Sequence, residues 1–301
     1  MFLYLFPRTR IARVSTYVRN SACKCTAFFP YTQNFHYFFS IFLHISAIFT
    51  IFAPAKASFR SVKAQIMAIG NVTPDSFYAA SRLGSTDAVV AWAQQALADG
   101  ADILDIGACS TRPGSTPASE EEEWRRLEPA LAALRSALPE VRLSVDTFRP
   151  EIARRALAQF GPLIINDISG GCEAMYDVVR QARVPYIWTL RGDLDLPARM
   201  PELRNIDLIL DPGFGFIGST EADYECMRNM HRLRAYNLPI LVGVSRKSMV
   251  WRPLGLTPET CLEATQALQL YALEQGATIL RTHDVKETAQ TIKLFNYICN
   301  F

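Results

Sequence analysis

The sequence predicts an α/β protein folded as a (β/α)8 TIM barrel, with a shortened fifth βα unit and an irregular N-terminal extension before it. From residue 65 onward, short apolar runs alternate with longer amphipathic stretches, which favours parallel strands joined by right-handed helical crossovers. Eight such units over about 235 residues match the size of this barrel. A doubly wound open sheet is the alternative.

The predicted strands are short apolar runs, as expected for parallel strands that are buried on both faces. The second run, 103–106, lies between Gly100 and Gly107 and opens into a small, polar and cationic loop. We expect strands at residues 66–70, 103–106, 141–145, 163–165, 185–189, 206–210, 240–244 and 278–280.

The predicted helices begin at recognisable capping residues. Ser85 is suited to cap a helix over 86–98, and Ser119 to cap a helix whose first turn is rich in acidic side chains. Pro150 suits the first turn of the next helix, and further helices are expected at 173–182, 221–234, 258–274 and 286–297. Between 189 and 206 there is room for only one or two turns, at about 198–204, so the fifth crossover is predicted to be short.

Residues 1–60 differ from the rest of the chain and are predicted to lie outside a barrel domain that spans residues 61–301. No acidic residue precedes Asp75, and residues 38–53 are apolar and rich in Phe and Ile. This pattern is similar to a signal peptide or a membrane anchor. We favour a third interpretation, a start codon placed too far upstream, with the anchor as the alternative.

Composition limits the function classes. The net charge of the 301 residues is only +2, which gives no support to a nucleic-acid partner. The 7 cysteines form no C-x-x-C pair and no cluster with histidine, so neither a zinc site nor a disulfide framework is indicated. We therefore expect a cytoplasmic protein with reduced thiols, and no membrane partner for the barrel.

Polar side chains follow every predicted strand, and in a barrel all these strand ends meet at one rim. The chemistry of the residues sorts them into three groups. Asp146, Asn166, Asp211 and Lys247 together complement a flat, nitrogen-rich heterocycle with a lactam. Asn71, Arg281 and His283 suit a diphosphate with Mg²⁺, while Phe77 and Phe216 suit an aromatic co-substrate.

Seven motifs in order resemble the dihydropteroate synthase family. They read NVTPDSF, DIGxxSTRPG with Ala108 and Cys109 at the variable positions, SVDT, INDISGG, DPGFGF, LVGVSRKS and LRTHDVKE, and they run from about residue 66 to the C-terminus. The resemblance implies a TIM barrel, usually dimeric, that joins (7,8-dihydropterin-6-yl)methyl diphosphate to 4-aminobenzoate and releases diphosphate. It also implies Mg²⁺ as the cofactor.

The resemblance implies a role for each matched position. Pterin contacts fall on Asp146, Asn166, Asp211 and Lys247, and the diphosphate contacts fall on Asn71, Thr111, Arg112, Arg281 and His283, with Asn71 also the metal ligand. The 4-aminobenzoate contacts fall on Phe77, Pro113, Phe216, Ser245 and Arg246. Lys247, Asp146, Arg281 and His283 are the expected catalytic residues. The implied partners are these two small molecules and a second copy of the chain.

Two other functions remain open. One is a degenerate paralogue that binds pterin without turnover, because the fifth unit is short and Thr189 and Leu190 stand where the family usually has His-Met. The other is a pterin-dependent methyltransferase barrel. The SRKS and RPG loops suit 4-aminobenzoate and diphosphate, and this favours the synthase.

Overall fold

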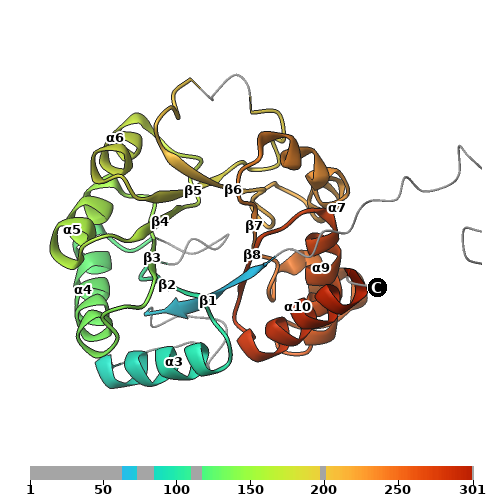
Figure 1. Cartoon of the computed structure of the whole chain (residues 1–301), viewed down its shortest axis with the longest axis horizontal. Helices are drawn as coiled ribbons and strands as arrows, with labels where there is room; N and C mark the ends of the chain where they lie inside the picture. Colours follow the sequence, from blue (N-terminus) through green and yellow to red (C-terminus); the bar gives the residue numbers. More distant parts are fainter. Residues whose placement is uncertain (1–62, 73–84, 110–116, 197–200, 300–301) are drawn as a thin grey trace, which may run out of the picture. The chain divides into compact units, whose positions relative to one another are not determined.

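Eight parallel strands form a barrel with helices around it in the computed structural model, which describes residues 63–72, 85–109, 117–196 and 201–299 (Figure 1). The strand order is β6-β5-β4-β3-β2-β1-β8-β7, and a parallel bridge from Leu210 to Ile240 joins the two ends. The strands are β1 (Gln65–Asn71), β2 (Ile103–Gly107), β3 (Leu143–Asp146), β4 (Ile164–Asp167), β5 (Pro185–Thr189), β6 (Asp207–Asp211), β7 (Leu241–Val242) and β8 (Ile279–Thr282). The predicted barrel is therefore confirmed.

Helices begin where capping chemistry places them. Ser85 Oγ accepts from the backbone N–H of Ala88 at 3.2 Å, and Ser119 Oγ accepts from that of Glu122 at 3.2 Å. The helices of the described part are α3 (Thr86–Ala98), α4 (Glu120–Ala137), α5 (Pro150–Phe160), α6 (Glu173–Ala182), α7 (Thr220–Asn229), α8 (Ser248–Trp251), α9 (Leu262–Gln275) and α10 (Val285–Cys299).

Two predicted helices differ from the structure. The helix predicted over 221–234 ends as α7 at Asn229 and continues as a 3-10 helix over Met230–Tyr236. The helix predicted from residue 258 begins only at Leu262, because the preceding residues form a turn in which Thr257 N donates to Thr260 Oγ1 at 3.0 Å. Short α8 was not predicted, since four residues carry too little periodicity to indicate a helix.

The connection between β5 and β6 carries no helix in its described residues, 190–196 and 201–206. Its leucines Leu194, Leu196 and Leu203 are buried in the same hydrophobic cluster as Trp188 and Leu210 of the flanking strands. Loop leucines therefore cover the outward faces of β5 and β6 where a helix would otherwise pack. The barrel keeps a continuous apolar shell despite the short fifth unit.

The interior of the barrel is closed at one level by a separate apolar cluster. Because side chains alternate along a strand, one residue from nearly every strand points inward at each level. The cluster consists of Met67, Ile103, Ile164, Ile187, Ile209, Leu241 and Ile279, all buried. It forms the floor on which the carboxyl ends of the strands carry their polar residues.

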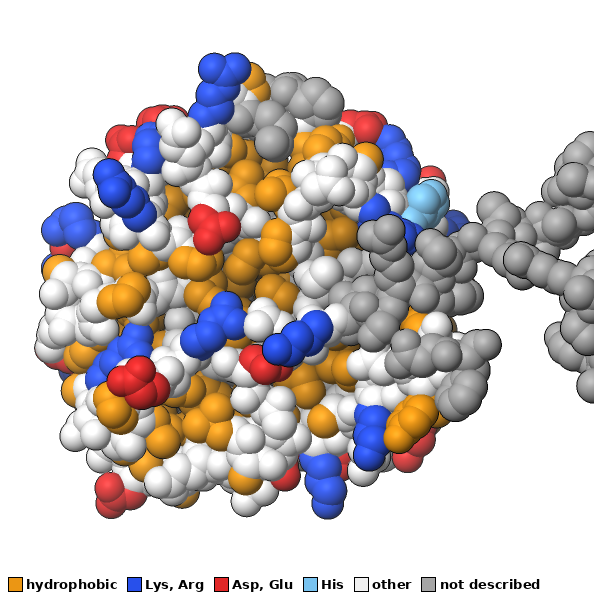
Figure 2. Space-filling model, viewed as in Figure 1, with side chains coloured by type: hydrophobic (Ala, Val, Ile, Leu, Met, Phe, Trp, Pro, Cys, Tyr) orange, Lys and Arg blue, Asp and Glu red, His pale blue; other side chains and the backbone are white. Residues whose placement is uncertain are grey.

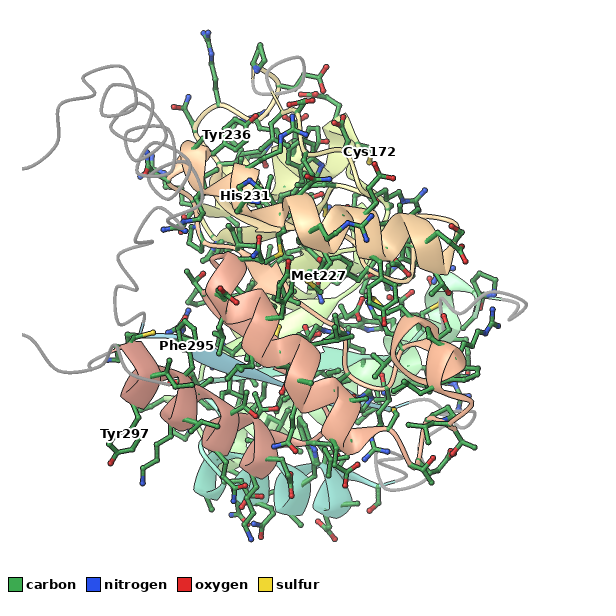
Figure 3. The ribbon with its side chains drawn as sticks, turned by 90° about the vertical axis from the view of Figure 1, so that its right-hand side faces the viewer. Cys172, Met227, His231, Tyr236, Phe295 and Tyr297 are labelled. Atoms are coloured by element: carbon green, nitrogen blue, oxygen red, sulfur yellow. The ribbon has the colours of Figure 1, made fainter. Side chains whose placement is uncertain are left out.

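The outer surface mixes charges of both signs. Figure 2 shows lysine, arginine and acidic side chains scattered over one face without a large patch of either sign, as the small net charge leads one to expect. On α10, Phe295 is buried whereas Tyr297 projects from the helix and is 57% exposed (Figure 3). None of the helices described here is long and apolar enough to cross a membrane.

Candidate active site

A polar layer lies directly above the apolar floor of the barrel. Two residues beyond a floor residue, the same face of the strand carries Asp105 in β2, Asn166 in β4, Thr189 in β5, Asp211 in β6 and Arg281 in β8. Leu143 and Val145 belong to the outer cluster, so Ser144 and Asp146 of β3 also face inward. Because inward-facing side chains recur every two residues, the first inward-facing residue beyond the floor is polar in each of these strands.

An ion-pair network organises this layer. Arg281 donates from Nε to Asp105 Oδ2 at 2.7 Å and from Nη2 to Asp146 Oδ2 at 2.6 Å. The amide of Asn166 donates to the same Asp105 oxygen at 3.0 Å. Asp105 is fully buried, and its Oδ2 atom accepts from both the Arg281 guanidinium and the Asn166 amide.

Several polar atoms of the layer have no partner among the described residues. They are Asp105 Oδ1, Ser144 Oγ, Asn166 Oδ1 and Thr189 Oγ1, all buried. A buried polar atom that lacks a hydrogen bond costs free energy, about 1–3 kcal/mol each. Their concentration at one level of the barrel indicates a site for a polar molecule that supplies the missing donors and acceptors.

Lys247 reaches into this layer from the loop after β7. Its ammonium donates to the backbone carbonyl of Phe214 and lies 4.9 Å from the centre of the Phe216 ring. A Cβ on Gly215 would lie 3.0 Å from Lys247 Cδ, and Gly215 has a φ of +81°. Both the close contact and the positive φ favour glycine at this position. Gly215 thus lets the backbone of the DPGFGF loop approach the lysine side chain closely.

Burial shifts the protonation of the charged groups. Burial raises the pKa of Asp146 to about 7, although Arg281 opposes the shift. Burial lowers the pKa of Lys247 to about 8, although Asp211 favours the charged amine. Burial also raises the pKa of Asp211. Burial disfavours the charge on Arg281, but Asp105 and Asp146 outweigh this and raise its pKa. Groups poised near neutral pH in one cavity are typical of a functional site.

The loops after β7 and β8 are joined by hydrogen bonds at the rim. Ser245 Oγ lies 3.2 Å from His283 Nδ1 and accepts from the His283 backbone N–H at 3.2 Å. Arg246 donates to both carboxylate oxygens of Asp284, at 3.1 and 2.6 Å, and to the Pro258 carbonyl at 2.7 Å. The Arg246 guanidinium is therefore bound within the protein.

Asn71 ends β1 directly beside Gly107 of β2, its partner in the strand register. A Cβ on Gly107 would lie 3.7 Å from Asn71 Oδ1 and 3.4 Å from the Asp146 Cβ, so the absent side chain keeps open the space between them. No group of three or more His, Cys, Asp or Glu side chains in the described ranges is arranged to hold a metal. An amide oxygen such as that of Asn71 is instead suited to a Mg²⁺ that arrives with phosphate oxygens and water.

The structure brings together most of the predicted site residues. Asp146, Asn166, Asp211, Lys247 and Arg281 lie together in the polar layer, while Ser245, Arg246, His283, Phe216 and Asn71 lie in or beside the strand ends around it. Phe77, Thr111, Arg112 and Pro113 lie outside the described residues. Sequence reasoning overlooked Asp105, Ser144 and Thr189, which stand within the predicted strands or at the end of one rather than in the loops. A polar residue spaced by two from an inward-facing apolar one was the signal that could have found them.

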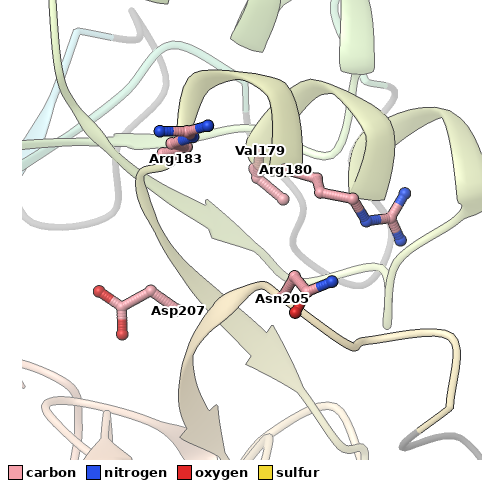
Figure 4. Close-up of a pocket in the computed structure, with 5 residues that line it drawn as sticks. All are labelled: Val179, Arg180, Arg183, Asn205 and Asp207. Carbon is pink, nitrogen blue, oxygen red and sulfur yellow. The ribbon is translucent and has the colours of Figure 1, made fainter.

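A second pocket lies at the opposite end of the strands. Val179, Arg180, Arg183, Asn205 and Asp207 line it, where α6 ends and β6 begins (Figure 4). None of the predicted site residues is among these lining residues. In parallel barrels the functional face is the carboxyl end of the strands, so this pocket lies on the other face.

Fold and site together define a barrel enzyme that binds a polar heterocycle. The sequence profile of the family described as "Pterin binding enzyme" matches residues 67–203 and 198–283, which contain all eight strands except the start of the first.

The dihydropteroate synthase of Escherichia coli K12 is 34% identical over 257 residues, which cover 76% of this chain and 89% of that protein. The solved dihydropteroate synthase of Xanthomonas albilineans with 4-aminobenzoic acid is 34% identical with a TM-score of 0.69, and the alignment covers 78% of this chain and 93% of the other. That of Coxiella burnetii in complex with pteroic acid is 30% identical with a TM-score of 0.71, over 78% and 93%. The chain belongs to the dihydropteroate synthases, transferases of folate biosynthesis.

Proposed function

We propose that this chain condenses (7,8-dihydropterin-6-yl)methyl diphosphate with 4-aminobenzoate, and that the residues of the polar layer carry the reaction. The observation that supports this most directly is the set of buried, unpartnered polar atoms above the barrel floor. A pterin presents amino, lactam and ring nitrogen groups on one flat edge, and it offers hydrogen-bond partners for such atoms. The relatives reported above are synthases, which does not favour a methyltransferase or a non-catalytic paralogue.

The pterin would be held by hydrogen bonds of complementary polarity. The Asp211 carboxylate, which already accepts from the Gly213 backbone N–H at 2.9 Å, would accept from the amino and ring N–H groups. The Asn166 amide and the Lys247 ammonium would donate to the ring nitrogens and the lactam oxygen. Asp146 would accept a further N–H in its ionised form.

The diphosphate would lie at the rim, toward Arg281 and His283 and the predicted residues Asn71, Thr111 and Arg112. The bond between the methylene carbon and the diphosphate oxygen breaks, the amine nitrogen of 4-aminobenzoate bonds to that carbon, and the amine loses a proton. Cations at the rim stabilise the negative charge that grows on the leaving diphosphate. Because the aromatic amine is neutral and nucleophilic, little general-base catalysis is needed.

Mg²⁺ fits this site as an ion that binds together with the diphosphate. Among the described residues the protein offers the Asn71 amide oxygen rather than a cluster of carboxylates, and Mg²⁺ in phosphate sites commonly uses few protein ligands. When bound, the ion would supply charge neutralisation for the leaving group. Asn71 would hold it next to the open space above Gly107.

The 4-aminobenzoate would occupy the rim beside Phe216, Ser245 and the backbone of Arg246, with Phe77 and Pro113 completing its surroundings. An aromatic ring against Phe216 gains apolar burial, and the Ser245 hydroxyl and backbone N–H groups can hydrogen-bond to the carboxylate. We also propose a cytoplasmic homodimer, on the basis of the family resemblance, which light scattering and cell fractionation would test.

Isothermal calorimetry with the pterin diphosphate tests the binding part of this proposal. We expect binding that Mg²⁺ strengthens by about tenfold or more, equivalent to ~1.4 kcal/mol. Asn71→Ala should remove the Mg²⁺ effect while leaving pterin without diphosphate bound as before. Absence of binding to the wild-type chain, with or without Mg²⁺, would contradict the proposal.

A further inference from the structure

We propose that Asp284 is a positioning residue of the active site: through its ion pair with Arg246 it holds a left-handed backbone turn and so fixes Lys247 in the cavity. Asp284 is not among the residues predicted to touch either substrate. The importance given to Lys247 rests on the proposed function, whereas the link from Asp284 to the turn rests on the geometry alone.

The turn before Lys247 has an unfavourable backbone conformation. Arg246 has a φ of +59°, in the left-handed region that side chains with a Cβ seldom adopt. The next residue returns to extended backbone, with a φ of −77° and ψ of 157° at Lys247, where α8 begins. The Lys247 backbone N–H donates to the Val244 carbonyl at 3.1 Å and closes the turn. Something other than local preference must therefore stabilise residue 246.

The ion pair is placed to provide this stabilisation. Arg246 donates from Nε and Nη2 to the two oxygens of Asp284 and from Nη1 to the Pro258 carbonyl. The two side chains are only 8% and 10% exposed, so solvent screens the pair little. A planar guanidinium bound at three points permits one orientation of its side chain and thereby restricts its backbone.

Asp284 is itself held firmly in place. Its backbone N–H donates to Thr282 Oγ1 at 3.1 Å, and its carbonyl accepts from the Thr288 N–H at 3.0 Å. It therefore stands between β8 and α10, both of which belong to the barrel framework. The ion pair between Asp284 and Arg246 therefore ties the loop after β7 to β8 and α10.

The position of Lys247 depends on the turn because the residue follows Arg246 directly. Its ammonium lies on the Phe214 carbonyl and beside the Phe216 ring, and a Cβ on Gly243 would be only 3.8 Å from it. If residue 246 relaxed to a negative φ, the direction of the following Cα–Cβ bond would change. The ammonium would then move away from Arg281 and Asp211, whose charges act on it here.

The test compares Asp284→Asn with the double variant Arg246→Gly/Asp284→Asn. The amide keeps the shape of Asp284 but removes its charge, which leaves a buried guanidinium without its partner. In the double variant no buried charge is left unpaired, and glycine adopts a positive φ without a steric cost. Asp177→Asn is the matched control, since Asp177 pairs with Arg180 at 2.7 Å on the exposed surface of α6.

Three measurements are made: thermal unfolding, calorimetry with a free pterin at a temperature where each variant is folded, and crystal structures without ligand. The free pterin lacks the 4-aminobenzoate part, so the affinity reports on Lys247 and not on a contact with residue 246. We expect Asp284→Asn to bind the free pterin about tenfold more weakly and to lose the positive φ at residue 246. The double variant should regain affinity to within about threefold of wild type, and Asp177→Asn should match wild type. If Asp284→Asn does not fold, the double variant alone tests the proposal. It should then recover folding, the positive φ at residue 246 and the affinity.

Two results would overturn the proposal. One is a folded Asp284→Asn that keeps both the positive φ and the wild-type affinity. The other is a double variant as weak as the single one, because a merely structural loss of stability would not be repaired in the binding site by glycine. If the wild-type chain itself does not bind the free pterin, the proposed function fails, and the φ of residue 246 still decides the positioning role.

Discussion

Asp105 illustrates how one buried carboxylate can organise a site without touching its solvent-exposed rim. It accepts from Arg281 and Asn166 through one oxygen, and its other oxygen has no partner among the described residues. Removing one member of a buried ion pair leaves the other uncompensated, which typically costs roughly 3–5 kcal/mol. Arg281 keeps Asp146 as a second partner, so a smaller loss is expected here.

We expect Asp105→Asn to yield a folded protein with turnover lowered by about tenfold or more, equivalent to ~1.4 kcal/mol of transition-state stabilisation. The reason is that Arg281 loses the charge that directs its Nε. Asp102→Asn is the control, because Asp102 lies on the same stretch but caps the other end of the barrel by accepting from the Ile66 N–H at 2.8 Å. Equal turnover in both variants would refute a role for Asp105 in the site.

The pH dependence of pterin affinity follows from two residues. Burial raises the pKa of Asp146 to about 7 and lowers that of Lys247 to about 8. Below the first value Asp146 is protonated and loses its capacity to accept two hydrogen bonds; above the second Lys247 is neutral and loses its charge. Pterin affinity should therefore be highest between about pH 7 and 8.

Calorimetric titrations across the pH range check this expectation. Asp146→Asn should weaken the acidic limb, to which Asp211 also contributes because burial raises its pKa, and leave the basic limb in place. An affinity that does not change between pH 6 and pH 9, about one unit beyond either pKa, would show that these two groups do not bind the pterin.

The elements around the site were predicted unequally well. Helices with side-chain caps at Ser85 and Ser119 begin where expected, because the cap is a local interaction that the sequence encodes in a few residues. The early end of α7 at Asn229 was not predicted, and the 3-10 helix that follows it contacts α9 as well as α7. Asp105 was overlooked because it lies within β2 rather than after it, and its partners are 61 and 176 residues away.

The loops after β1 and β2 predict an order of substrate binding. These strands are neighbours, with Asn71 paired to Gly107, so Asn71 and the predicted residues Thr111 and Arg112 emerge from adjacent strand ends. A diphosphate has enough acceptor oxygens to bind donors from both loops at once. Phe77 and Pro113, which are predicted to contact 4-aminobenzoate, follow the same two strands in the sequence, so we expect its site to form only after diphosphate binds.

We expect 4-aminobenzoate to bind very weakly alone and much more tightly once diphosphate, Mg²⁺ and a pterin are present. By thermodynamic reciprocity, 4-aminobenzoate should tighten diphosphate binding by the same factor. Calorimetry in both orders of addition measures the two factors. The same affinity for 4-aminobenzoate with and without diphosphate would indicate two independent, preformed pockets.

At the scale of the whole molecule, residues after 60 supply all the described strands of the barrel. The eight strands of the described residues lie between residues 65 and 282, and buried leucines pack against β5 and β6 in the described parts of the connection between them, which carry no helix. We therefore expect a chain without residues 1–60 to fold with unchanged melting temperature and pterin affinity. Circular dichroism and calorimetry measure these; a truncated chain that is insoluble while the full chain is monodisperse would show that the segment is structural.

The measurement that tests the central claim most directly is the formation of 7,8-dihydropteroate by the purified chain. The pterin diphosphate, 4-aminobenzoate and Mg²⁺ are supplied, and 7,8-dihydropteroate and diphosphate are quantified together. We predict equal amounts of both products, and a loss of about a hundredfold or more in folded Lys247→Ala, since the buried ammonium contributes several kcal/mol to the transition state. Binding of both substrates without product, or an unchanged rate in Lys247→Ala, would contradict the account.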